Sequence, residues 1–307
     1  MTGNPAIRVL DGETVTGIAA GEVVERWASV AKELVENAID AGAGRILVEV
    51  VSSDRSIASL RVTDDGCGMN PEDASVAFLP HATSKIRVLA DLRECRTLGF
   101  RGEALASIAA VARVTMMTRT TDGGTGTLVA MRGGVQERLE HTGAPPGTSV
   151  QVEMLFYNTP GRRKFQKPAA YELSRISSQI EALALSHPRI AFRLVQNGKE
   201  RLYTSGSGEL SGAIVQLYGP ALARELIPVH GKGPGFSISG YVSRPAVSRT
   251  HPYQVLVSIN GRPVASKEVA SAIRAAYGTL LPKDRYPVAF VALEIEPGGI
   301  DANVHPA

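Results

Sequence analysis

The stretch from Trp27 to Ala41 combines a helical pattern with carboxylate and amide side chains on one face. At about 100° per residue, Glu33, Asn37 and Asp40 share that face, and Glu36 lies at its edge. A carboxylate can orient and deprotonate a water, and an amide oxygen suits Mg²⁺, which also takes phosphate oxygens. Phosphoanhydride hydrolysis would use such a face. A plain acidic surface fits the pattern too, and the pattern does not choose between Glu33 and Glu36 as the base.

A second candidate site follows an expected strand, in the segment Asp64-Asp65-Gly66-Cys67-Gly68-Met69. An aspartate at a strand end can accept a hydrogen bond from an exocyclic amine such as that of adenine. Gly66 and Gly68 would let a flat ring or a backbone approach closely, with Met69 next in the chain. Since Asp-Gly is also among the commonest turn signals, this segment alone favours an ordinary turn.

A third segment has features of a phosphate site. HATSK at residues 81–85 precedes Gly99 and Gly102, and a helix is expected over Gly102 to Val111. Amides at a helix N-terminus bind anions, although a loop with a capped helix explains the same residues. Thr83 and Ser84 supply hydroxyl groups, and Lys85 a positive charge, that could bind phosphates. No G-x-x-x-x-G-K-[ST] motif occurs in the sequence, which excludes a P-loop as the phosphate site.

The composition of the 307-residue chain limits the classes of protein to consider. Its 44% apolar residues suffice for ordinary cores, and no apolar stretch has the length of a membrane helix. Two separated thiols, Cys67 and Cys95, suit a reducing compartment and cannot form a structural zinc site alone. Residues 1–11 carry no secretory pattern, so we expect a cytoplasmic or nucleoid-associated protein, or a nuclear one in a eukaryote. A net charge of +3 permits nucleic-acid contact without requiring it.

The expected elements fall into two groups. Early helices and later hairpins predict an α+β sandwich, with helices on one face of a largely antiparallel sheet. A long helix, Ala169 to Ser186, follows a break at Phe156 to Gly161. From Ile190 the pattern restarts, which predicts a second, smaller α/β domain, and we divide the chain into residues 1–185 and 186–307. The other strands are expected over Arg45 to Val51, Ile57 to Thr63, Ala112 to Arg119, Thr125 to Met131, Val135 to His141, Thr148 to Met154 and Val288 to Ile295, and the other helices near Gly208 to Tyr218 and Ser266 to Tyr277.

The order and spacing of these motifs resemble those of the MutL family of DNA mismatch repair proteins, within the GHKL superfamily. The matching segments are AAGEVVER from residue 19, KELVEN from residue 32, DxGCG from residue 64, HATSK, GFRGEALASI from residue 99, FYNTPGRRKF from residue 156 and NVHPA from residue 303. GFRGEAL and FYNTPxRRKF are highly specific, and the resemblance covers about residues 9–307. It implies a GHKL sandwich followed by a domain with a left-handed βαβ crossover.

The resemblance implies ATP and Mg²⁺ as cofactors and gives roles to individual residues. Glu33 matches the general base, which decides against Glu36, while Asn37 matches the Mg²⁺ ligand. Asp64 matches the carboxylate that binds the adenine amine. The other implied nucleotide contacts are Asp40, Gly66, Gly68, Met69, Thr83, Ser84, Lys85, Leu98, Gly99, Phe100, Arg101, Gly102 and Thr148, several of them in a lid segment. The implied DNA contacts are Lys267 and Asn303, and a basic run of unassigned role comprises Arg162, Arg163 and Lys164.

In function, the resemblance implies a slow ATPase that acts as a switch in DNA mismatch repair. Two copies would dimerise on binding ATP and clamp DNA, mainly through its backbone and without sequence preference. The clamp would act between a MutS-type mismatch recognition protein and a downstream nuclease or helicase, with no membrane partner. Two alternatives are another GHKL enzyme, such as a topoisomerase ATPase region or a histidine kinase, and a non-hydrolysing DNA-binding module with a vestigial pocket. The FYNTPxRRKF segment argues against the first.

Three residues depart from the family pattern, and the end of the sequence matters as well. Trp27 stands where proline is common, and losing that preset φ predicts a modest effect. Asp65 stands where asparagine is usual, so an extra carboxylate either lies near the phosphates or points away. Gly161 replaces a usual alanine. A lysine that reaches the γ-phosphate follows Ala307 in the family, so we expect a chain without it to hydrolyse ATP poorly.

Overall fold

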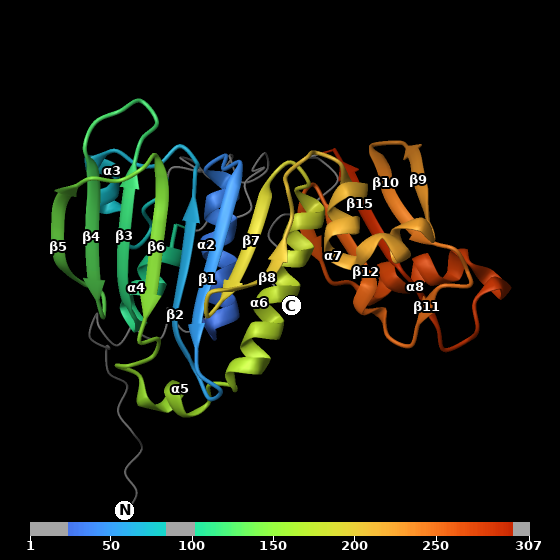
Figure 1. Ribbon diagram of the computed structural model, residues 1–307, viewed down its shortest axis with the longest axis horizontal. Helices are drawn as coiled ribbons and strands as arrows, with labels where there is room; N and C mark the ends of the chain where they lie inside the picture. The colour runs from blue at the N-terminus through green and yellow to red at the C-terminus, as the bar shows by residue number, and fades with distance from the viewer. Residues whose placement is uncertain (1–23, 84–101, 297–307) are drawn as a thin grey trace, which may run out of the picture.

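The computed structural model describes residues 24–83 and 102–296, which form a large and a small sheet flanked by helices (Figure 1). The large sheet has eight strands in the order β5-β4-β3-β6-β2-β1-β7-β8. Its neighbours pair antiparallel except β1 and β7, which are parallel, so the predicted α+β fold with a largely antiparallel sheet is confirmed. The strands are β1 (Arg45–Ser52), β2 (Ile57–Asp64), β3 (Arg113–Arg119), β4 (Gly126–Arg132), β5 (Val135–Thr142), β6 (Gly147–Glu153), β7 (Ala191–Gln196) and β8 (Lys199–Tyr203).

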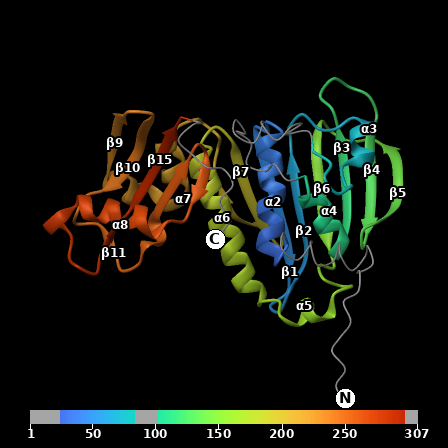
Figure 2. The same ribbon diagram turned by 180° about the vertical axis from the view of Figure 1, so that it is seen from behind.

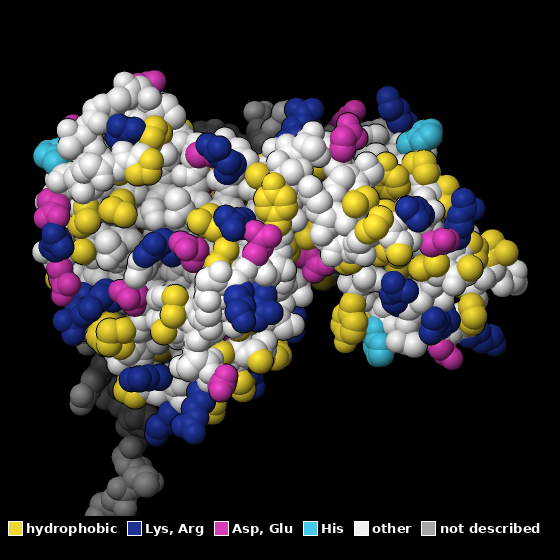
Figure 3. Space-filling view, in the orientation of Figure 1, with side chains coloured by type: hydrophobic (Ala, Val, Ile, Leu, Met, Phe, Trp, Pro, Cys, Tyr) yellow, Lys and Arg dark blue, Asp and Glu magenta, His cyan; other side chains and the backbone are white. Residues whose placement is uncertain are grey.

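Helices cover one face of this sheet, as Figure 2 shows for α2 (Trp27–Asp40) and α4 (Ala104–Val111). The strands alternate accordingly, since Ile46, Val48 and Val50 of β1 are buried against the helices. The opposite face carries interspersed basic and acidic side chains (Figure 3). The remaining helices of this part are α3 (Pro71–Val76), α5 (Pro160–Lys164) and α6 (Ala169–Ser186), the last of which packs beside α2.

The small sheet has the order β13-β12-β15-β10-β9, with β12 parallel to β15. The connection between these two strands passes through α8, so the predicted βαβ crossover is present, while its left hand stays a prediction. A break in α7 at Gly219, whose φ is 84°, lies just after the predicted helix end at Tyr218. The elements are α7 (Leu210–Arg224), β9 (Leu226–Gly233), β10 (Phe236–Ser243), β12 (Val255–Ile259), β13 (Arg262–Val264), α8 (Lys267–Ala276) and β15 (Ala289–Ile295), with a two-stranded ribbon of β11 (Ser248–Arg249) and β14 (Tyr286–Pro287) and short helices η2 (Pro252–Gln254) and η3 (Gly278–Leu280).

The division predicted after residue 185 lies too early for the large sheet. Strand β7 pairs with β1, and β8 continues the same sheet, so this sheet extends to Tyr203. Phe192 and Leu194 of β7 are buried in the core of the first part. The second core includes Ile214 of α7 and Phe290 of β15, together with Leu185 near the end of α6. A strand pattern marks β7 and β8 correctly but does not show which sheet they join.

None of the helices in residues 24–83 and 102–296 combines the length and apolar character needed to cross a membrane.

The N-terminus of α2 is held by a side chain from α6. Its N-cap residue, Arg26, makes no side-chain capping bond, and Trp27, at the position of the usual proline, is buried. The backbone N–H of Ala28 instead donates to Oε2 of Glu172 at 3.1 Å. Burial raises the pKa of Glu172, while the bond from Ala28 and the charges of Arg26 and Arg175 oppose that rise. Glu172 therefore supplies the acceptor that the local sequence lacks.

We expect Glu172→Leu to lower the free energy of unfolding by about 1–3 kcal/mol, because it leaves the Ala28 N–H buried without an acceptor. Glu172→Gln should cost less, since its amide oxygen still accepts the bond. Urea unfolding followed by circular dichroism compares the two variants. Equal losses in both would show that α2 does not depend on this acceptor.

Candidate functional site

Three strand ends meet at one edge of the large sheet. Asp64, the last residue of β2, is paired with Thr148 of β6, and Thr148 is paired on its other side with Thr118 of β3. The C-terminus of α2 joins this edge, since the N–H of Cys67 donates to the carbonyl of Ala41 at 2.9 Å. The structure thus brings together residues from four separate elements, including two that the sequence predicted, Asp64 and Thr148.

Asp64 is a half-buried carboxylate with unusual proton affinity. Its Oδ1 accepts a hydrogen bond from the N–H of Gly66 at 2.9 Å. Burial raises its pKa from 3.8 to about 6, and backbone hydrogen bonds from Gly66 and Thr148 only partly oppose this. A carboxylate has about four acceptor positions, so Asp64 retains capacity for a further donor such as an amine.

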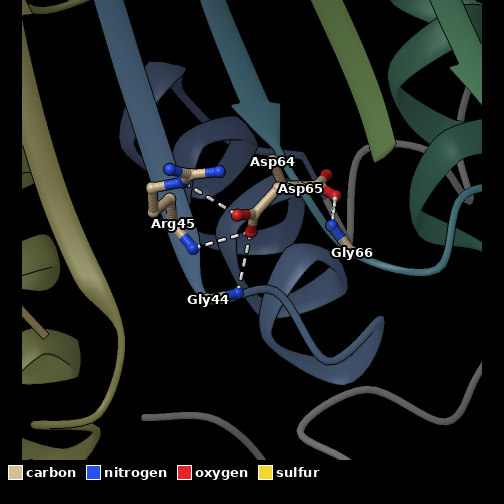
Figure 4. A network of polar contacts seen from close by, with 5 residues as sticks. All are labelled: Gly44, Arg45, Asp64, Asp65 and Gly66. Carbon is tan, nitrogen blue, oxygen red and sulfur yellow. Dashed lines mark hydrogen bonds and ion pairs between the residues drawn. The ribbon is translucent and has the colours of Figure 1, made fainter. Parts of the chain in front are cut away.

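The adjacent Asp65 is turned in a different direction (Figure 4). Its Oδ1 accepts from the backbone N–H groups of Gly44 at 2.8 Å and Arg45 at 2.7 Å, and its Oδ2 accepts from Arg45 Nε at 2.9 Å. Partial burial acts to raise the pKa of Asp65, but the bonds from Arg45 and Gly44 outweigh it and the pKa is lowered. The extra carboxylate therefore anchors the start of β1 and does not accompany Asp64.

Two glycines at this edge have no room for a side chain. Gly68 has φ 65°, and a Cβ there would lie 1.9 Å from the carbonyl oxygen of Arg119. Gly147 has φ 106°, and its Cβ would lie 2.1 Å from the carbonyl oxygen of Asp64. Both combine a left-handed backbone with direct backbone packing, which only glycine allows.

Thr118 is a site residue that the sequence analysis missed. Its fully buried Oγ1 accepts from the N–H of Met69 at 2.9 Å, lies 3.0 Å from Thr148 Oγ1 and donates to the Gly147 carbonyl at 3.2 Å. It thereby ties the segment after β2 to the start of β6. A buried threonine in a strand gives no distinctive signal, and only the β3–β6 register places it here.

The acidic face of α2 lies where its helical periodicity predicted. Glu33, Asn37 and Asp40 are half-buried, while Leu34 and Val35 on the other side are buried. This face has the ligand chemistry for magnesium, with an amide oxygen at Asn37 one turn from the carboxylate of Glu33. In the described part of the chain, no three or more acidic, histidine or cysteine side chains gather as a metal site, so a magnesium ion at Asn37 would need phosphate and water oxygens as further ligands.

Glu36 has a more perturbed environment than the sequence suggests. Its pKa is raised to about 7, mainly by burial; the charges of Glu33 and Asp40 contribute to the rise, and those of Lys32 and Arg262 oppose it. Lys32 Nζ lies 3.8 Å from Glu36 Oε1, so a basic residue does border this acidic face. A pKa near 7 also suits a general base, so these properties do not themselves choose between Glu33 and Glu36.

The turn between β12 and β13 of the small sheet lies against the same region. His187, which follows α6, is hydrogen-bonded to the backbone of Gly261, and a Cβ on Gly261 would lie 3.1 Å from His187 Cε1. Burial lowers the pKa of His187, opposed by this bond and by the charge of Asp40. Next in the turn, Arg262 acts on Glu36. The second core therefore contacts the candidate site through one short turn.

The described residues on either side of the gap at 84–101 lie side by side. A Cβ on Gly102 would lie 2.7 Å from the carbonyl oxygen of Ala82 and 2.9 Å from Cβ of Thr83. His81 Nδ1 lies 3.2 Å from Glu103 Oε1. Thr83 and Gly102 are thus brought together, and α4 begins two residues after Gly102. The other predicted residues of this region, and one predicted DNA contact, lie outside the described residues: Ser84, Lys85, Leu98, Gly99, Phe100, Arg101 and Asn303.

Lys267 lies apart from this cluster, as the exposed first residue of α8 over the small sheet (Figure 1). Gly161 has open space around its Cβ position, so the usual alanine would fit there equally well. Taken together, the sheet edge offers a half-buried hydrogen-bond acceptor at Asp64, closely packed backbone, and the hydroxyl groups of Thr118 and Thr148. These groups suit a flat base with an exocyclic amine. The face of α2 offers a carboxylate and an amide for a water and a metal-bound phosphate.

Two protein-family models match the chain. The model described as histidine kinase-, DNA gyrase B- and HSP90-like ATPase matches residues 25–149. That range contains Asp64, Thr118, Thr148 and the whole of α2. The model described as DNA mismatch repair protein, C-terminal domain, matches residues 214–307, which include most of the small sheet's elements.

Curated relatives and solved structures agree with these models. The chain is 58% identical to the DNA mismatch repair protein MutL of Methanoculleus marisnigri over 302 residues, 98% of this chain and 52% of the relative. It is 49% identical to MutL of Desulforudis audaxviator over 98% of this chain and 53% of the relative. The chain thus spans about half the length of the curated relatives it matches.

Among solved structures, the N-terminal domain of a DNA repair protein matches with a TM-score of 0.79 and 26% identity, over 95% of this chain and 90% of that one. The ATPase domain of Aquifex aeolicus MutL complexed with ADP matches with a TM-score of 0.69 and 26% identity, over 90% of this chain and 94% of that one.

The opposite pKa shifts of Asp64 and Asp65 predict opposite effects of removing each charge. Between about pH 4 and pH 6 the folded protein binds more protons at Asp64 than the unfolded chain does, so ionising Asp64 costs stability as pH rises. Asp64→Asn should therefore raise the free energy of unfolding by about 2–3 kcal/mol at pH 7.5 and lose most of that gain near pH 4. Urea unfolding at both pH values measures this.

The matched control is Asp65→Asn, which should lower stability at pH 7.5, because its carboxylate is held ionised by Arg45 and Gly44. If both variants shifted stability in the same direction, the different environments assigned to the two carboxylates would be wrong.

Proposed function

Because this chain belongs to the MutL family of DNA mismatch repair proteins and holds their ATPase region, we propose that it binds ATP with Mg²⁺, hydrolyses it slowly and uses it as a switch. The observation that carries the proposal is the meeting of the Asp64–Thr148–Thr118 edge with the C-terminal end of α2, the helix that carries the acidic face. The ADP held by the Aquifex aeolicus MutL ATPase domain supports an adenine nucleotide as the ligand.

The base of the nucleotide lies at the sheet edge in this proposal. Asp64 accepts a hydrogen bond from the adenine amine, and its half-buried position strengthens that bond by excluding water. Gly66 and Gly68 lie beside the ring in this proposal, in a segment that packs closely on Ala41 and Arg119. Met69 lies beside them and is held by Thr118, while Thr148 supplies a hydroxyl behind the base.

The phosphates lie toward α2 and the start of α4. Glu33 would orient and deprotonate the attacking water, and Asn37 would hold a magnesium ion, which would offset the negative charge of the phosphates. Asp40 completes the polar face. Thr83 and Gly102, which the structure brings together, offer hydroxyl and backbone groups to the phosphates, with the predicted contacts in residues 84–101 completing the set.

The switch acts on DNA in this proposal. ATP binding favours a dimer of this region that clamps DNA, and hydrolysis resets it between a MutS-type mismatch recognition protein and a downstream nuclease or helicase. Lys267 supports a DNA-contacting role for the small-sheet part, because a cation in the first turn of a helix opposes the helix dipole and gains nothing there for stability. Asn303 is the second proposed contact.

The base assignment is tested by comparing Glu33→Gln with Glu36→Gln. We expect Glu33→Gln to reduce ATP turnover by about a hundredfold or more while nucleotide binding persists, because the water loses its proton acceptor. Glu36→Gln should have a smaller effect, since Glu36 is paired with Lys32. Phosphate release measures turnover, and displacement of a fluorescent ATP analogue measures binding.

Loss of turnover only in Glu36→Gln would transfer the role of base to Glu36. An unaltered protein that binds no ATP at millimolar concentration would favour the alternative of a vestigial pocket.

DNA contact through Lys267 is tested by its charge reversal. Lys267→Glu should weaken binding to duplex DNA and reduce the slope of log affinity against log salt by about one, because a phosphate contact is lost. Lys232→Glu on β9 makes the same change at another exposed lysine of the small sheet and should weaken binding less. Fluorescence anisotropy over a salt series measures both. A flat salt response in the unaltered protein would contradict backbone binding.

A further inference from the structure

The carbonyl groups at the C-terminal end of α4 and of Ala112, the residue after it, are hydrogen-bonded to other segments. Backbone N–H groups of the β4–β5 turn donate to two of them, Gly134 to Ala109 at 2.8 Å and Gly133 to Ala112 at 3.1 Å. Such carbonyls have no partner within their own helix and are usually left to water. This two-turn helix is thus anchored from outside itself.

The other two partners come from the FYN segment, residues 156–158. The N–H of Phe156 donates to the carbonyl of Val111 at 2.7 Å, and Nδ2 of Asn158 donates to the carbonyl of Ala110 at 2.8 Å. Phe156 is fully buried with φ 64°, an uncommon conformation for a residue other than glycine. Tyr157 packs against the β4–β5 turn as well, because a Cβ on Gly133 would lie 2.6 Å from its hydroxyl.

The opposite end of α4 lies at the proposed phosphate side of the nucleotide site. It begins at Ala104, two residues after Gly102, which packs against Ala82 and Thr83. A helix of eight residues is too short to be stable alone, so its geometry depends on its anchors. A change at the C-terminal anchor is therefore transmitted to the N-terminal amides.

We propose that Asn158 is a positioning residue of the ATPase: by holding Ala110 at one end of α4, it fixes the amides at the other end for the phosphates. This inference rests on the proposed function, since it takes the phosphates to lie at the start of α4. It gives the FYN segment a role in the nucleotide site, which it does not touch. Asn158 is the only side chain among the four donors, so it is the donor that substitution can remove.

The first measurement is hydrogen exchange of the nucleotide-free protein, comparing Asn158→Ala with Asn197→Ala. Asn197 is a matched control, because its side-chain amide bonds both the N–H and the carbonyl of Ser52 in the same sheet, away from Asp64. We expect Asn158→Ala to speed exchange about tenfold as far as Ser107, whose N–H donates to the carbonyl of Glu103, and Asn197→Ala to leave α4 unchanged. Faster exchange confined to the last turn of α4 would overturn the proposal.

The second measurement separates the phosphates from the base. In displacement of a fluorescent ATP analogue, Asn158→Ala should weaken ATP binding about tenfold and leave adenosine binding unchanged, while Asn197→Ala changes neither. An equal loss for ATP and adenosine would indicate general destabilisation and overturn the proposal, as would unchanged ATP binding. Failure of the unaltered protein to bind ATP would instead overturn the proposed function and this inference with it.

Discussion

The hydrogen-bonded register of β2, β6 and β3 is the constraint on which the candidate site depends. It places Asp64, Thr148 and Thr118 in one row at the end of the sheet, although they come from distant parts of the chain. A slip of one residue would send these side chains to the opposite face. The backbone bond from Cys67 to Ala41 then fixes this row to the end of α2, so the row and the helix that carries the acidic face are held together.

Much of the local structure could be predicted from the sequence, because it follows from short-range rules. The bounds of α2, α6 and the strands follow the apolar periodicities closely, and the half-buried face with Glu33 and Asn37 follows from helical geometry. The motif order predicted the family, which the comparisons confirm. The roles of individual residues on this face are more specific and remain proposals.

Contacts between distant segments could not be predicted in the same way. Glu172 caps a helix 144 residues earlier in the chain, and nothing local marks it as a cap. The opposite orientations of Asp64 and Asp65 depend on which backbone amides lie within reach, and those belong to the start of β1. Strands β7 and β8 join the large sheet because α6 leads the chain back to β1, with which β7 pairs. A periodic pattern does not encode that direction.

The contact of the β12–β13 turn with the site has a thermodynamic consequence. Arg262 acts on Glu36, and Gly261 packs on His187, beside the charge of Asp40. A ligand that changes the charge of the α2 face thereby changes the free energy of this contact. Linkage makes that effect mutual, so a ligand of the second core that changes this contact alters affinity on α2 by the same factor. Gly261, just before β13, and Arg262, its first residue, are thus the point where the small sheet bears on the charge of the α2 face.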